Sequence, residues 1–100
     1  MGNGHSVRLL CEVVEEQVEL TFVELCRTSG AAEEMVAELV ACGLLDPVGG
    51  EPRSWRFGGA SLGLTRRALR LMSDLGVNAP GAAVAIELLD RIERLERGLR

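Results

Sequence analysis

Lysine and tyrosine are absent from this chain of 100 residues, and histidine occurs once, at position 5. All 11 basic residues are arginines, which excludes Schiff-base and other lysine chemistry. A cysteine or serine nucleophile needs a neighbouring base, and the single histidine lies in a glycine-rich N-terminal segment. We therefore identify no catalytic residue and predict a protein that is not an enzyme.

Cysteine is scarce and odd in number, at Cys11, Cys26 and Cys42. A secreted disulfide scaffold is expected to have an even number, and a zinc site is expected to have closely spaced Cys or His pairs. Neither pattern occurs. The sequence therefore predicts reduced, buried cysteines in a cytoplasmic protein, with no metal and no cofactor.

Long hydrophobic runs are missing as well. None approaches the roughly 20 residues that span a bilayer, and the N-terminus lacks the order of a secretory signal. We expect no contact with a membrane. Aromatic residues make up only 3% of the chain, so the predicted core is aliphatic.

Charge is unevenly distributed along the chain. The net charge is −4 and the isoelectric point is near 5.0, which disfavours binding to nucleic acid. Residues 1–51 contain ten acidic residues and two arginines, whereas residues 52–100 contain five acidic residues and nine arginines. The two halves carry net charges of −8 and +4, so they are suited to different partners.

Local signals predict a helix-turn-helix. Thr21 and Glu24 form a capping box that opens a short helix, which ends at Gly30. A second helix over about residues 32–42 ends at Gly43. Because little more than Gly30 separates the two helices, they form a helix-turn-helix.

The remaining segments complete a single domain over residues 1–100. Residues 1–6 are predicted to be a flexible tail and residues 7–14 a strand. Residues 45–57, rich in Gly and Pro, are predicted to form a two-stranded hairpin, the wing, which completes a helix-turn-helix unit over residues 21–57. Two helices follow within residues 60–100, one ending at Gly76 and the other starting at Ala79-Pro80.

The last helix has a heptad-like apolar seam. Its members are Ala85, Leu88, Ile92, Leu95 and Leu99. Four acid-to-arginine pairs at i, i+4 support this helix, namely Glu87–Arg91, Asp90–Arg94, Glu93–Arg97 and Glu96–Arg100. The distal half of the seam has little remaining chain to pack against. We therefore predict a homodimer joined by this seam, with packing on the chain's own core as the alternative.

The order of these elements resembles the MerR-like winged helix-turn-helix, and the sequence is most similar to its chaperone-modulator branch, the CbpM family. The resemblance covers about residues 15–100. Its principal stretches are Phe22-Val23-Glu24-Leu25-Cys26-Arg27-Thr28-Ser29-Gly30, Gly43-Leu44-Leu45-Asp46-Pro47, Trp55-Arg56-Phe57, Arg67-Ala68-Leu69-Arg70-Leu71 and Leu88-Leu89-Asp90-Arg91-Ile92. The resemblance implies a regulator that binds the J-domain of a DnaJ-like co-chaperone and inhibits it.

The second helix agrees with that reading. Its polar face offers no Arg, Lys, Asn or Gln to read bases, and its carboxylates would repel phosphates. A basic protein surface, such as the basic second helix that the family resemblance implies for a J-domain, is a better partner. An ordinary solvated acidic face is the alternative. The predicted partner-binding residues are Glu24, Glu33, Glu34, Ala37, Glu38 and Ala41.

Arginines of the wing and of the following helix support a second hypothesis, a dimeric MerR-like transcription regulator. MerR-like proteins touch the phosphate backbone at these places, and arginines there would give salt-sensitive binding. The same arginines could instead pair with acidic groups of the protein itself or of a partner. The candidate DNA-contacting residues are Arg53, Arg56, Arg66, Arg67 and Arg70.

Overall fold

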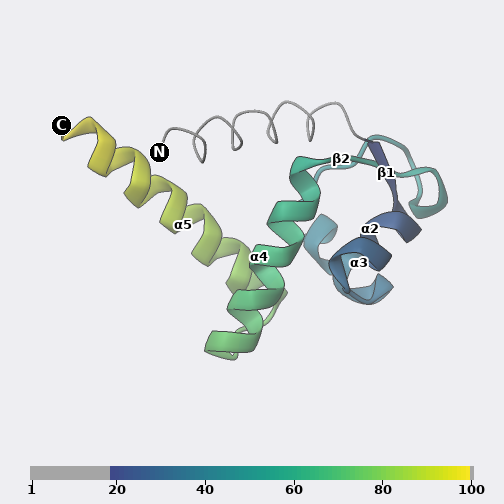
Figure 1. Ribbon diagram of the computed structural model, residues 1–100, viewed down its shortest axis with the longest axis horizontal. Helices are drawn as coiled ribbons and strands as arrows, with labels where there is room; N and C mark the ends of the chain where they lie inside the picture. The colour runs from purple at the N-terminus through teal and green to yellow at the C-terminus, as the bar shows by residue number, and fades with distance from the viewer. Residues whose placement is uncertain (1–18, 100) are drawn as a thin grey trace, which may run out of the picture.

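The computed structural model describes residues 19–99, and helices dominate this range (Figure 1). In chain order the elements are β1 (Glu19–Thr21), α2 (Phe22–Ser29), α3 (Glu33–Ala41), the 3-10 helix η1 (Pro52–Ser54), β2 (Arg56–Gly58), α4 (Ala60–Leu75) and α5 (Ala79–Gly98). This order confirms the predicted mainly helical class. The tail and strand predicted over residues 1–14 lie outside the described residues.

The helix-turn-helix has the predicted ends. The amide of Glu24 donates to the Thr21 hydroxyl at 3.1 Å, and the Thr21 amide donates to the Glu24 carboxylate at 2.8 Å. These two bonds satisfy amides that the start of α2 would leave unpaired. Gly30 ends the helix with φ of +82°, a left-handed conformation that favours glycine. The polypeptide then turns directly into α3.

The strand pairing of the wing differs from the prediction. β2 pairs antiparallel with β1, with Leu20 opposite Phe57. Only one bridge, between Val48 and Arg56, joins the two sides of the predicted wing. The predicted hairpin is therefore confirmed only at one residue pair, where the Val48 amide donates to the Arg56 carbonyl at 3.0 Å and the Arg56 amide donates to the Val48 carbonyl at 2.9 Å. Pro47 and Pro52 interrupt the amide donors of this segment, whereas β1 contains no proline and offers β2 an uninterrupted edge.

The core lies where the helix-turn-helix, the sheet and the last two helices meet. Its fully buried side chains include Leu25, Leu39 and Phe57, with Ile86 from α5. The prediction of an aliphatic core is wrong in one respect, because Phe57 is the largest of these buried side chains. Trp55 packs edge-to-face between Phe57 and Phe22, with ring centroids 5.9 and 5.3 Å away.

The last two helices pack on each other near their connection, after which α5 extends away from the rest of the molecule (Figure 1). Gly76 ends α4 with φ of +69°, and the Asn78 side chain accepts from the Gly81 amide at 2.9 Å to cap α5. Both ends agree with the prediction. An ion pair of 3.3 Å between Arg67 and Asp90 also joins the two helices. Within residues 19–99, no helix is long and apolar enough to cross a bilayer.

Candidate functional site

Helix α3 separates its side chains into a buried face and an acidic face. Val36 and Leu39 are fully buried, because they meet the core below the helix. The carboxylate-bearing residues of the opposite face, Glu33, Glu34 and Glu38, are exposed. The small residues between them are Ala37, which is half-buried, and Ala41, which is exposed. Five of the six predicted partner-binding residues therefore belong to this helix.

Glu24, the sixth predicted residue, lies on α2 and has a structural role. Its carboxylate accepts the Thr21 amide in the capping box. The pKa of this carboxyl is lowered from its ordinary value, first by the backbone hydrogen bond of Thr21 and then by the Thr21 hydroxyl. Because one carboxylate oxygen is bound to the backbone, Glu24 offers a partner less than the free carboxylates of α3 do.

The two cysteines within the described range differ in exposure. Cys26 is half-buried, and its thiol pKa is raised by burial and, to a smaller extent, by the negative charges of Glu33 and Glu34. The prediction of a buried thiol is wrong for Cys42, which is exposed. Cys42 is the C-cap residue that follows the last residue of α3, Ala41. Its side chain therefore does not continue the buried face of the helix. Cys11 lies outside the described residues.

The exposed face of α3 offers no Arg, Lys, Asn or Gln, the side chains that make bidentate contacts with bases. In helix-turn-helix proteins that bind DNA, this face of the second helix enters the major groove. Here the helix reads Glu-Glu-Met-Val-Ala-Glu-Leu-Val-Ala and lacks Arg, Asn and Gln. In such a complex its carboxylates would lie close to the DNA phosphates and repel them.

The five candidate DNA-contacting arginines divide into two groups. Arg66 donates to the Thr28 carbonyl at 3.2 Å, Arg67 pairs with Asp90 at 3.3 Å, and Arg56 donates to the Trp55 carbonyl at 3.4 Å, so these three bind groups of their own chain. All five side chains are exposed, and the other group consists of Arg53 and Arg70. The structure therefore brings no single row of five free guanidinium groups together.

A groove of about 520 Å³ lies between the start of α2 and η1, next to the first residue of α3. Sequence reasoning missed this groove, because its walls come from three segments that are distant in the chain. Val23, at its surface, is 50% exposed. The lining residues are Thr21, Phe22, Val23, Glu33, Glu51, Pro52 and Arg53.

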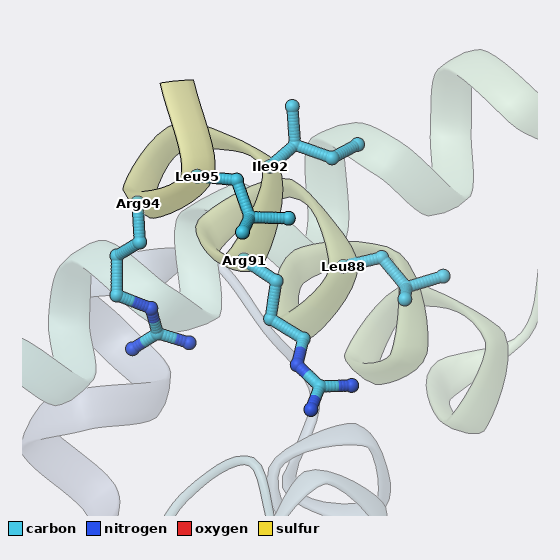
Figure 2. A pocket seen from close by; sticks show the side chains of 5 residues that line it. All are labelled: Leu88, Arg91, Ile92, Arg94 and Leu95. Atoms are coloured by element: carbon cyan, nitrogen blue, oxygen red, sulfur yellow. The ribbon is translucent and has the colours of Figure 1, made fainter. Parts of the chain in front are cut away.

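The apolar seam of α5 is largely uncovered. Leu88 and Ile92 are about half exposed, and Leu95 and Leu99 are 70% and 88% exposed. Only Ala85, nearest α4, is half-buried. Figure 2 shows Leu88, Ile92 and Leu95 projecting from successive turns, with the guanidinium groups of Arg91 and Arg94 directed away from Ile92. These five residues line a shallow groove of about 500 Å³.

The charge pairs along α5 follow the prediction only in part. The ion pair between Glu93 and Arg97 forms at 3.0 Å. Asp90 contacts Arg67 of α4 instead of Arg94, because the packing of the two helices brings that guanidinium closer. Residues 19–99 hold no cluster of three His, Cys, Asp or Glu side chains placed to bind a metal ion.

Comparison with known proteins agrees with this architecture. The family described as MerR HTH family regulatory protein matches residues 20–100. A protein of Coxiella burnetii named Chaperone modulatory protein CbpM is 36% identical over 88 residues, which cover 88% of this chain and 83% of that protein. Proteins of the same name from Salmonella arizonae and Citrobacter koseri are 36% and 34% identical, over 78% and 85% of this chain and 77% and 84% of their own lengths. The chain therefore belongs to the MerR helix-turn-helix family, within its chaperone-modulator branch, the CbpM family.

Proposed function

We propose that this protein is a non-enzymatic, cytoplasmic regulator that binds the J-domain of a DnaJ-like co-chaperone and inhibits its activity. The relatives are named as chaperone modulatory proteins, which supports a chaperone-modulating role. The J-domain is the surface of such a co-chaperone that engages an Hsp70 partner. Inhibition works by occlusion, because a J-domain covered by this protein cannot dock on Hsp70.

The observation that carries the proposal is the acidic exposed face of α3. Glu33, Glu34 and Glu38 take the place of base-reading side chains on the helix that enters DNA in related folds. Carboxylates at the rim of an interface attract a basic surface and speed its association. Affinity comes from apolar neighbours that lose water on contact. The alanines Ala37 and Ala41 allow a partner helix to approach this face closely.

We further propose that two copies associate through the apolar seam of α5. The seam exposes several large aliphatic side chains in one stripe, which is unusual for a monomer in water. A two-fold contact would cover the stripes of both chains with each other. Because the C-terminal part of α5, which bears the seam, extends away from α3, each copy would keep its acidic face free (Figure 1).

Charge reversal tests the role of the α3 face. The double variant Glu33→Arg/Glu34→Arg is compared with wild type by surface plasmon resonance against the isolated J-domain of a DnaJ-like co-chaperone from the same genome. Both side chains are exposed, so the fold should survive, which circular dichroism checks. We expect the loss of roughly 1–2 kcal/mol in binding free energy at physiological salt, with a slower association rate. A higher salt concentration should weaken J-domain binding by the wild type more than J-domain binding by the variant.

A matched control reverses two acidic residues elsewhere. Asp74→Arg/Glu87→Arg changes the net charge by the same amount on α4 and α5, and it should bind as wild type does. Stimulation of Hsp70 ATPase by the full-length co-chaperone gives the functional readout, and wild type should suppress it. Equal binding by the α3 variant and wild type at both salt concentrations would show that the acidic face is only solvated.

A further inference from the structure

We propose that the groove between α2 and η1 is an anchoring site that receives an aliphatic side chain from a basic segment of the partner. This inference rests on the proposed function, because it names where that partner is held. It assigns a separate task to each part of the surface. The carboxylates of α3 attract the partner, and the groove retains it.

Val23 gives the groove apolar surface that does not belong to the core cluster. Phe22 and Trp55 pack against the core cluster, but Val23 does not belong to it. Val23 stands in the first turn of α2, half exposed, where polar residues are usually preferred. Together with Phe22 and Pro52 it gives the groove an apolar lining about large enough for one or two side chains.

The wall opposite Val23 is held in place by local bonds. The Ser54 hydroxyl donates to the Glu51 carbonyl at 2.9 Å, and the Glu51 amide lies 3.4 Å from the same hydroxyl. Gly49, with φ of +124°, lets the loop pass so close to Ser54 that an added Cβ would lie 2.6 Å from the Ser54 carbonyl oxygen. A preformed wall loses little conformational entropy when a ligand enters.

The charges around the groove select the occupant. Glu33 and Glu51 line it on the α3 and η1 sides, and Glu34 follows directly on α3. These carboxylates complement Lys or Arg side chains that flank an aliphatic residue. Arg53 adds one positive charge to the rim, which suits a carboxylate or carbonyl oxygen of the same segment. A buried aliphatic anchor surrounded by polar contacts is the usual arrangement of a binding hot spot.

Kinetics separate an anchor from a steering charge. Val23→Ser removes the aliphatic surface, and we expect the dissociation rate of the J-domain to rise about five- to tenfold with little change in association rate. Glu38→Arg should mainly lower the association rate, because Glu38 is exposed on α3 and does not line the groove. The matched control is Val84→Ser on α5, because Val84 is 55% exposed against 50% for Val23. This control should bind as wild type does, and thermal unfolding confirms that each variant folds.

Amide chemical shifts provide a test that needs no substitution. On addition of the isolated J-domain, the amides of residues 21–23 and 51–53 should shift together with those at the start of α3. Shifts on α3 without shifts in the groove, combined with unchanged dissociation of Val23→Ser, would overturn the anchoring site and leave the proposed function intact. The chemical shifts of the groove amides could also change with protein concentration when no J-domain is present. That result would overturn the anchoring site and would indicate that a second copy of this chain occupies the groove. If wild type does not bind the J-domain at all, the proposed function itself fails.

Discussion

Glu24 was predicted both to contact a partner and to cap the first helix of the helix-turn-helix. Its position suggested a partner contact, yet its carboxylate accepts the Thr21 amide at 2.8 Å. That bond holds the pKa of the carboxyl below its ordinary value. The ionised carboxylate therefore makes the stronger hydrogen bond, which links the stability of α2 to pH.

The sign of this pH dependence follows from the direction of the pKa shift. A carboxyl with a lowered pKa in the folded state stabilises the protein above its unfolded pKa, and this contribution disappears as the pH falls through the folded pKa. We expect Glu24→Gln to lower the Tm at pH 7, while the two proteins should have similar Tm values at pH 3. Circular dichroism melts at both pH values provide the measurement. A Tm difference that is the same at pH 3 and pH 7 would contradict the role of the charge.

At the scale of elements, the loop between Val48 and β2 depends on one glycine. Gly49 has a positive φ and faces the Ser54 carbonyl at a distance that leaves no room for a methyl group. Its neighbour Gly50 has open space around the position of a Cβ and no positive φ. The two glycines therefore form a natural pair of test and control.

Substituting each glycine by alanine measures this difference. Gly49→Ala should lower the free energy of unfolding by about 1–3 kcal/mol, because it combines backbone strain with a steric clash. Gly50→Ala should leave the free energy of unfolding unchanged or raise it by less than about 1 kcal/mol. Urea unfolding of both variants gives the values. Equal stability of the two variants would contradict the geometry of the loop.

At the scale of the whole molecule, the apolar seam of α5 should decide the association state. Ile92→Glu/Leu95→Glu places two charges in the proposed contact, which costs several kcal/mol if that contact excludes water. We expect wild type to sediment as a dimer at tens of micromolar and the variant as a monomer.

The control for this experiment uses apolar residues outside the seam. Val48 and Leu75 are 77% and 63% exposed, so Val48→Glu/Leu75→Glu adds the same charge to the same class of side chain. This variant should remain a dimer. Sedimentation of wild type as a monomer would refute the proposed contact.

The charge distribution of the whole molecule also predicts how it treats DNA. Three of the five candidate arginines bind their own chain, and α3 offers no Arg, Lys, Asn or Gln to read bases. Any binding should therefore be weak, independent of sequence and lost as salt rises. Fluorescence anisotropy with two unrelated duplexes at low and physiological salt tests this. A tight complex with one duplex at physiological salt, abolished by Arg56→Ala, would favour the transcription regulator.

Local patterns in the sequence determined the helices and the polarity of their faces. The capping box at Thr21, the helix ends at Gly30 and Gly76, and the cap at Asn78 act through bonds within a few residues, so short stretches of sequence contain them. The acidic face of α3 follows from helical spacing alone. The ordered set of motifs was enough to indicate the family, which the comparisons confirm.

Only the tertiary structure decided which distant groups meet. β2 pairs along its length with β1 and makes only one bridge within the wing. Asp90 contacts Arg67, 23 residues away, in preference to Arg94 on its own helix. The groove beside Val23 exists because α2, α3 and η1 converge there. Pairing between distant segments depends on how helices pack, and local sequence does not contain that information. For the same reason, the exposure of the α5 seam depends on where the other helices lie.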